Sequence, residues 1–355
     1  MLTTWQKFSR QKLAVAGTGV IAVAVFIALF AYWLAPDPTP DANRMIVEIG
    51  GRKPGSEQLF LLLPKAVPPV AVSWWERTWN GRPDDVNYIP ITAYRKAGDS
   101  VIVDRYIDEG ISDRLAIPVS TFPKPAEEFV ETRHFWLGTD KYGRDILSRL
   151  LVGIRASLLV GAIAMLISLT IGLMLGALAG YYGGRWDDAI MWFINVIWSI
   201  PTLLLVFAIT FLLGKGFWQV FVAVGLTMWV NVARLVRGQM MQVKKMEYVE
   251  AARVLGYSDR RIILKHILPN MFGPVMVLAA SNFASAMVIE AGLSFLGVGV
   301  QPPQPSWGGM IRENYNFIIT NNPMLALVPG IAIMLLVLSF NLVGNGIRDA
   351  LDVKS

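Results

Sequence analysis

The sequence predicts an all-α polytopic membrane protein with six transmembrane helices and a small β-prone insert between the first two. Three observations support this prediction. Of the 355 residues, 54% are hydrophobic and only 16% are charged, whereas soluble domains usually contain about 25% charged residues. Six segments are apolar enough for a bilayer core, which needs roughly 20 residues of helix. Between the first and second segments, residues 36–135 have a different composition, rich in proline and charge.

The first predicted span is Leu13 to Leu34, an uncharged run of 22 residues. Three basic residues precede it, as they do in secretory signals, but the apolar part of a signal is only about 7–15 residues long. We therefore expect a retained anchor. The other five spans are predicted at 156–178, 189–213, 217–236, 271–295 and 325–343.

The distribution of charge predicts the orientation of these spans. The N-terminus carries three Lys or Arg residues and no acidic residue, and the segment 234–270 carries eight against three acidic residues. Short loops rich in Lys and Arg stay on the cytoplasmic side. An N-terminus inside, followed by six spans, places this segment and the C-terminus in the cytoplasm. The net charge of +6 is thus explained by membrane topology, and we expect no nucleic-acid partner.

Three parts of the chain follow from this topology. Residues 1–35 form the cytoplasmic N-terminus and the first transmembrane helix, 36–135 form an extracytoplasmic insert, and 136–355 form a five-helix core with a cytoplasmic loop at 237–270. The insert contains β-prone runs separated by turn residues, which favours a small β-rich domain, with a disordered linker as the alternative. The β-prone runs are 45–49, 59–63, 86–93 and 100–107.

The residue inventory excludes several kinds of chemistry. The chain has no cysteine, so disulfides and thiolate metal sites are excluded, and with only two histidines a His-based zinc centre is not expected. No phosphate-binding Gly-rich loop ending in Lys-Ser or Lys-Thr occurs. We therefore expect no catalytic residue, no metal and no bound cofactor in this chain.

The loop around residues 240–269 is the most informative segment. Residues 243–255 have helical periodicity, and Gly256 can end such a helix because glycine accepts the left-handed conformation. Ser258 can cap a second short helix with Asp259 in its first turn, and Pro269 ends or kinks that helix. We expect two short helices with a sharp elbow. A connector lying on lipid headgroups through Lys and Arg is the alternative.

The same loop resembles the EAA loop of ABC-importer permeases, in which it forms coupling helices that sit in a groove of the ATPase subunit. His266 stands where that family commonly has Ile, a variant similar to its peptide-transporter branch. The resemblance implies an ATPase-coupling role for Glu250, Ala251, Ala252, Gly256, Ser258, Asp259, Leu268 and Pro269.

Five further blocks resemble the C-type permease subunit of dipeptide and oligopeptide ABC importers, and the resemblance covers roughly 136–355. It implies a type I ABC-importer permease fold in a bacterial inner membrane, surrounded by lipid. The insert lies outside the resemblance, so nickel, glutathione or a peptide antibiotic stay open as alternatives to peptides. The blocks are Leu137–Asp140, Gly143–Arg149, Gly176–Gly184, Glu290–Gly297 and Gln301–Gly308.

The resemblance also implies partners. These are a homologous second permease, two ATPase subunits or domains that use ATP and Mg, and an extracytoplasmic substrate-binding protein. An ion-coupled carrier acting alone is the first rival hypothesis, but it needs internal repeats and several intramembrane charges. A membrane-anchored enzyme or receptor is the second, but five further spans exceed what an anchor requires.

A few residues inside the predicted spans are candidates for the translocation path. Glu290 lies in an apolar span, where a carboxylate costs about 2.5–3.5 kcal/mol, so it should face protein or a watery cavity. It is either a path residue or a structural carboxylate. Asn282, next to Ser281, is a weaker path candidate.

Two other features of the spans concern packing and shape. Three glycines recur every four residues in the second span, which predicts a flat face for close helix packing, and Pro201 predicts a kink in the third span. The glycines are Gly172, Gly176 and Gly180.

Overall fold

A computed structural model describes residues 4–67, 71–214, 216–319 and 322–351. The chain divides into two compact units. Within the described residues, the first unit comprises the chain up to Val25, Ala156–Gln301 and the chain from Ala332, and the second comprises Phe26–Arg155 and Pro302–Ile331.

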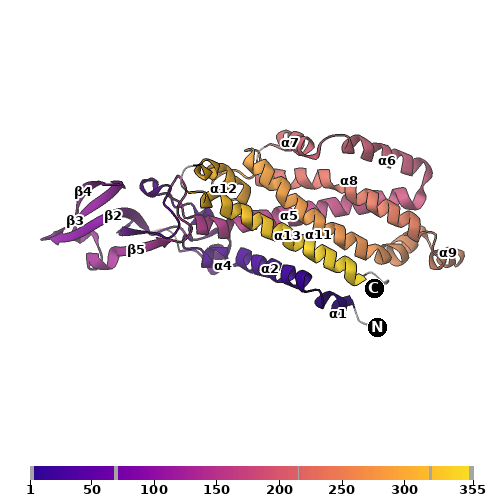
Figure 1. Ribbon diagram of the computed structural model, residues 1–355, viewed down its shortest axis with the longest axis horizontal. Helices are drawn as coiled ribbons and strands as arrows, with labels where there is room; N and C mark the ends of the chain where they lie inside the picture. Colours follow the sequence, from indigo (N-terminus) through magenta and orange to yellow (C-terminus); the bar gives the residue numbers. More distant parts are fainter. Residues whose placement is uncertain (1–3, 68–70, 215, 320–321, 352–355) are drawn as a thin grey trace. The chain divides into compact units, whose positions relative to one another are not determined.

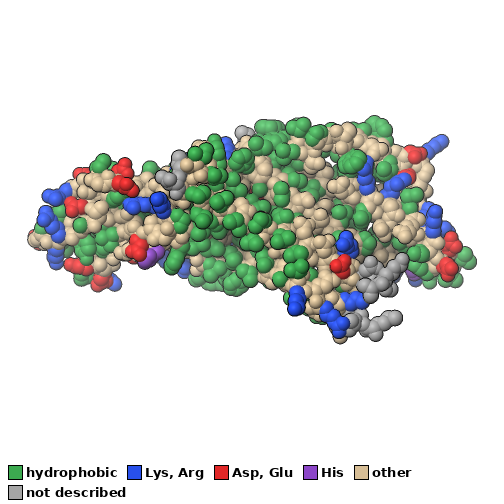
Figure 2. Space-filling view, viewed as in Figure 1, with side chains coloured by type: hydrophobic (Ala, Val, Ile, Leu, Met, Phe, Trp, Pro, Cys, Tyr) green, Lys and Arg blue, Asp and Glu red, His purple; other side chains and the backbone are tan. Residues whose placement is uncertain are grey.

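Long helices make up the first unit, some of them continuing into the second (Figure 1). Figure 2 shows hydrophobic side chains covering the long helices of this unit, while charged side chains gather near α9. The helices are α1 (Thr4–Ser9), α2 (Lys12–Leu29), α5 (Ile146–Tyr182), α6 (Gly184–Trp198), α7 (Thr202–Leu213), α8 (Phe217–Val243), α9 (Glu247–Val254), α10 (Asp259–Arg261), α11 (Phe272–Phe295) and α13 (Met324–Leu351).

The described residues contain five helices that are long and apolar enough to cross a membrane, or six if α6 and α7 together count as one span. The third predicted span, 189–213, is not one helix, because α6 and α7 are bent by 91°. Pro201 is the N-cap of α7 with extended backbone angles. The residue before a proline is pushed out of the helical region, so the expected kink is a complete break.

The glycines of α5 let it pack directly against α8. A Cβ added to Gly172 would lie 2.4 Å from the Cβ of Val232, and one added to Gly176 would lie 2.5 Å from the carbonyl oxygen of Ala233. Gly180 meets the next turn of α8 in the same way. Because these separations are shorter than van der Waals contact, only glycine permits the approach, and the predicted packing face is confirmed.

The second unit contains a five-stranded antiparallel sheet in the order β4-β3-β2-β1-β5. Alternate residues of β1 face opposite sides: Leu61 packs with Ile91, and Phe60 packs with Phe135. The predicted β insert is therefore confirmed. Its elements are β1 (Ser56–Pro64), β2 (Val86–Ala97), β3 (Ser100–Asp108), β4 (Ile111–Pro118) and β5 (Val130–Phe135), together with the short helices α3 (Ala31–Leu34), α4 (Trp74–Asn80) and α12 (Trp307–Asn314).

The strand predicted at 45–49 is wrong. Val47–Ile49 form a 3-10 turn, and Ile46 and Ile49 pack together against the sheet beside Phe60. The apolar positions are three residues apart, which suits a helical turn, whereas a strand places every second residue on one face.

A buried ion network joins α12 to the start of α5 within the second unit. The Arg144 guanidinium donates to Asp140 at 2.6 Å and to Glu313 at 2.5 Å, and Arg144 and Asp140 are almost completely buried. Trp307 donates from its indole nitrogen to the carbonyl oxygen of Leu150 at 3.0 Å. These contacts give a structural role to three of the sequence blocks on which the family resemblance rests, those that contain Asp140, Arg144 and Trp307.

Candidate functional site

The loop between α8 and α11 is built from two arms. The first arm, α9, begins at Glu247 and not at 243 as predicted, because α8 continues to Val243 and a turn follows. On α9, Val249 and Ala252 are buried in an apolar core with residues of α5, α8 and α11. This buried side fixes the loop to the helices.

Gly256 forms the elbow between the arms. Its φ is +76°, and the amide nitrogens of Gly256 and Tyr257 donate to the carbonyl oxygens of Arg253 (3.0 Å) and Ala252 (3.1 Å). This bonding pattern is a Schellman motif, which ends a helix at a left-handed residue. A Cβ added to Gly256 would meet nothing within 4 Å, so the backbone alone requires glycine. The predicted turn is confirmed.

The second arm differs in detail from the prediction. Ser258 has N-cap backbone angles, but its side chain makes no capping hydrogen bond. Asp259 instead accepts a hydrogen bond from the hydroxyl of Tyr181 at 2.6 Å. The chain then continues through a π-helical turn at Ile262–Ile267 and a 3-10 turn at Leu268–Met271 into α11. Pro269 has no N–H and crowds the preceding turn, which accounts for this change of helical geometry.

The side of the loop that does not pack on the helices is apolar at its centre. The side chains of Val254 and Leu255 are 88% and 71% exposed, and Leu264 is 51% exposed. Large exposed apolar groups of this kind mark interaction surfaces. Of the predicted coupling residues, Ala252 is buried and Leu268 is half-buried, while the exposed ones are Glu250, Ala251, Gly256, Ser258, Asp259 and Pro269.

A cavity of about 350 Å³ lies within the first unit. Its wall combines apolar side chains with a few amides and hydroxyls, and it is lined by α8, α11 and both sides of the break between α6 and α7. Asn282 lies in this wall and donates to the hydroxyl oxygen of Ser168 at 3.3 Å. The polar lining residues are Thr202, Thr227, Asn231, Ser281, Asn282 and Ser285.

Glu290 occupies a different environment. Its side chain is completely buried. Among the described residues, Glu290 is not one of those that line the cavity. The Ser294 hydroxyl donates to Glu290 Oε1 at 2.6 Å, and the Val300 amide donates to the Ser294 oxygen at 3.0 Å. Glu290 is thus linked to the turn that follows α11.

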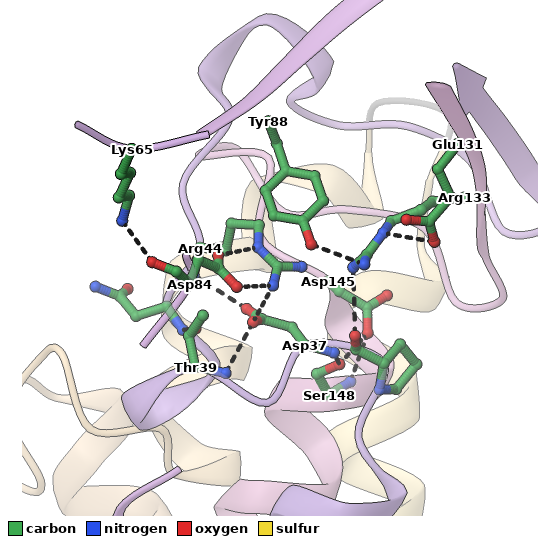
Figure 3. Close-up of polar contacts among 12 residues, drawn as sticks. Asp37, Thr39, Arg44, Lys65, Asp84, Tyr88, Glu131, Arg133, Asp145 and Ser148 are labelled. Atoms are coloured by element: carbon green, nitrogen blue, oxygen red, sulfur yellow. Dashed lines mark hydrogen bonds and ion pairs between the residues drawn. The ribbon is translucent and has the colours of Figure 1, made fainter. Parts of the chain in front are cut away.

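A second cavity, of about 330 Å³, lies within the second unit beside a polar cluster (Figure 3). Arg44 makes two hydrogen bonds to Asp84, at 2.6 and 2.5 Å. Burial lowers the pKa of Arg44, but the hydrogen bonds to Asp84 and the negative charges of Asp37 and Asp84 outweigh this effect, so the pKa is raised. The cations and carboxylates of this cluster largely neutralise one another.

The same cluster includes the residues at the start of α5. Asp145 Oδ2 accepts from the Ser148 amide at 2.8 Å and from the Ser148 hydroxyl, and that hydroxyl oxygen accepts from the Asp37 amide at 2.8 Å. Burial raises the pKa of the Asp145 carboxyl, and the Ser148 hydrogen bonds offset part of this rise. These contacts tie the start of the insert to α5.

Two contacts of the loop could not be predicted from the sequence. Tyr181, on α5, bonds to Asp259 through its hydroxyl, and its carbonyl oxygen accepts from the Lys244 side chain. These partners are more than 60 residues apart along the chain, so no local pattern predicts them. Among the described residues, no group of three or more His, Asp or Glu side chains could hold a metal ion.

Two family models match the chain. The model of the binding-protein-dependent transport system inner membrane component matches residues 172–354. The model of the N-terminal TM domain of oligopeptide transport permease C matches residues 2–48. The strands of the insert lie between the two matches.

Curated relatives agree with these matches. The chain is 43% identical over 219 residues to a glutathione transport system permease protein of Pectobacterium atrosepticum, covering 62% of this chain and 72% of that protein. It is 40% identical over 223 residues to an oligopeptide transport system permease protein of Bacillus subtilis (63% and 73% covered). It is 42% identical over 219 residues to a dipeptide transport system permease protein of the same organism (62% and 68% covered). The chain therefore belongs to the family of binding-protein-dependent transport system inner membrane components, the membrane-spanning permease subunits of ABC transporters.

Proposed function

We propose that this permease subunit forms the translocation path of an ABC importer for peptides, together with a homologous second permease. Two ATPase subunits hydrolyse ATP with Mg, and a soluble binding protein delivers the substrate. The observation that carries the proposal is the loop at Gly256: one side is fixed to the helices, and the other presents exposed Val254 and Leu255 beside Glu250.

The loop is connected to the cavity through two helices. Residues of α8 and α11 contribute to the apolar core under the loop, and the same two helices line the cavity through Thr227 and Asn282. A displacement of the elbow when the ATPases close therefore moves helices that bound the cavity. This connection supports an ATPase-coupling role for residues 250–252, 256, 258, 259, 268 and 269.

The cavity supports a path with weak selectivity. High-affinity pockets for polar ligands need several convergent donors and acceptors, and among the described residues this wall offers amides and hydroxyls but no carboxylate or cation. Asn282 is our candidate for a path residue. Glu290 is instead assigned a structural role, because its hydrogen bond with Ser294 links it to the turn after α11. Selection of the cargo then belongs to the binding protein.

Peptides are the proposed cargo because two of the relatives are peptide permeases. The third is a glutathione permease, and glutathione is itself a small peptide. The proposed location is the bacterial inner membrane, with both termini and the loop in the cytoplasm, because Lys and Arg concentrate in the N-terminus and in 234–270.

The coupling surface is tested by making its apolar centre polar. In the double variant Val254→Ser/Leu255→Ser, both changes are at exposed positions, so the subunit should still fold and insert. Burying a Val or Leu side chain contributes about 1.5–3 kcal/mol, and each 1.4 kcal/mol is about tenfold in affinity. We expect ATPase subunits to bind roughly tenfold or more weakly, measured by copurification, and uptake to fall with binding.

Val67→Ser is the matched control, because Val67 is a valine 80% exposed on the insert. This variant should retain both ATPase binding and uptake. Full ATPase binding and uptake by the double variant would contradict the coupling assignment.

A further inference from the structure

The short helix α4 exposes an unusual amount of aromatic surface. Three of its seven residues are tryptophans, and all three are exposed. Trp75 is 66% exposed and Trp79 is 53% exposed. A surface in contact with water rarely gathers large aromatic side chains in this way, so something other than water is expected to cover it.

Arg155 holds α4 at the end of the first membrane-spanning helix. Its guanidinium donates to the carbonyl oxygens of Ala28 at 2.6 Å and Leu29 at 3.2 Å, in the last turn of α2. It also donates to the carbonyl oxygens of Thr78 at 2.7 Å and Trp79 at 3.0 Å, in the last turn of α4. One side chain thus satisfies the free carbonyls of both helix ends.

Trp33 strengthens the same attachment. Its indole nitrogen donates to the hydroxyl oxygen of Thr78 at 3.1 Å, and the Arg77 guanidinium lies 3.9 Å from the centre of its ring. A helix of seven residues is unstable by itself in water. These contacts therefore explain why α4 forms at this place.

The orientation of α4 follows from its spacing. Trp75 and Trp79 are four residues apart and share one face, whereas Thr78 is buried against the protein. The end of a transmembrane helix lies near the membrane–water boundary, where tryptophan is enriched because its ring is apolar and its N–H is polar. With one acidic and one basic residue, Glu76 and Arg77, α4 has no net charge to select anionic lipids.

We propose that α4 is an interfacial anchor, in which Trp75 and Trp79 insert between lipid headgroups at the end of α2. The partner is the lipid bilayer itself, and zwitterionic lipid suffices because aromatic burial supplies the attraction. The base of the insert thereby rests on the membrane. The inference requires only that α2 spans the bilayer, and it holds for either orientation of the chain.

Spin labelling tests the proposal cleanly, because the chain contains no cysteine. Trp75→Cys and Trp79→Cys are labelled separately in the assembled transporter, in nanodiscs of phosphatidylcholine. Neither change touches the backbone carbonyls that Arg155 binds. We expect both labels to collide more with oxygen, which dissolves in lipid, than with a water-soluble nickel chelate.

Tyr94→Cys, at an exposed aromatic position on β2, is the control and should show the reverse preference. If the α4 labels prefer the nickel chelate, the helix lies in water and the proposal fails. If the α4 labels collide rarely with both reagents, protein covers the helix, and that result also overturns the proposal. ATPase binding is not part of the readout, so failure here leaves the proposed function intact.

Discussion

Individual residues of the loop differ in how far the sequence predicts their roles. The positive φ of Gly256 follows from a property of glycine itself, so the elbow was predictable from one residue and its helical flanks. Asp259 was predictable only as a residue of the first turn. Its partner Tyr181 is far away in the sequence, and only the packing of α5 against the loop brings the two together.

Asp145 illustrates a residue whose environment predicts a pH effect. Because burial raises its pKa, the folded protein binds this proton more tightly than the unfolded chain does. The resulting stability is present below the ordinary Asp pKa of about 3.9 and is lost as the pH rises through the raised pKa. We expect the difference in Tm between Asp145→Asn and wild type to shift in favour of the variant from pH 4.5 to 7.5.

The measurement is thermal unfolding of the purified protein in detergent at several pH values. Asp37 and Arg44, which lie near Asp145 with opposite effects on its pKa, are unchanged. Ser148→Ala is the control: it should lower the Tm at each pH and leave the pH dependence at least as steep, because the carboxyl group remains. A Tm difference for Asp145→Asn that is constant or falls with pH would refute the assignment.

At the scale of elements, apolar length and periodicity predicted the helices well and the strands less well. The spans were recognised because 20 apolar residues leave few alternatives. The break at Pro201 shows that an uninterrupted apolar run can still contain two helices. β4 and β5 were missed because each has only one buried residue and so lacks the alternation of apolar residues that marks a half-buried strand.

The contact between α5 and α8 allows a prediction about one element pair. Gly176→Ala places a Cβ 2.5 Å from the carbonyl oxygen of Ala233, and a backbone atom cannot move aside as a side chain can. Such overpacking costs about 1–3 kcal/mol, so we expect a clearly lower Tm in detergent.

Gly238→Ala is the matched control on α8, because a Cβ there meets nothing within 4 Å. Alanine favours helix over glycine by about 1 kcal/mol, so this variant should be as stable as wild type or slightly more stable. Equal Tm values for the two variants would show that the helices do not approach as described.

For the whole molecule, the helix contacts inside the first unit constrain the number of crossings. A Cβ added to Gly17 of α2 would lie 2.9 Å from the carbonyl oxygen of Ser339, and one added to Gly346 would lie 2.4 Å from the Cβ of Ala14. The start of α2 therefore lies beside the last part of α13, so the two helices run antiparallel. Chain ends on one side of a membrane require an even number of crossings, which favours counting α6 and α7 as one span.

The second unit supports the same topology. It joins the insert to residues 302–331, the two segments that a six-span chain places on one side of the membrane. Their contacts include Arg144 with Glu313 and the amide of Asn322 with the carbonyl oxygen of Arg52 at 3.2 Å. An even number of crossings does not say which side is outside. The distribution of Lys and Arg predicts that the insert is outside.

Accessibility to a membrane-impermeant thiol reagent decides the orientation. Single cysteines are introduced at three exposed serines of the cysteine-free chain: Ser112→Cys on β4, Ser258→Cys at the elbow and Ser9→Cys on α1. In intact spheroplasts that express the permease without the ATPase subunits, which would otherwise cover position 258, we expect labelling at position 112 alone, and labelling at 9 and 258 only after the membrane is permeabilised. Ser9→Cys tests the number of crossings. If an even number of spans separates positions 9 and 258, the two cysteines lie on the same side of the membrane and are labelled alike. Labelling of positions 9 and 258 but not 112 would show the opposite orientation, with the loop on the side where no ATPase could reach it. A difference in labelling between positions 9 and 258 would show that α6 and α7 do not cross as one span.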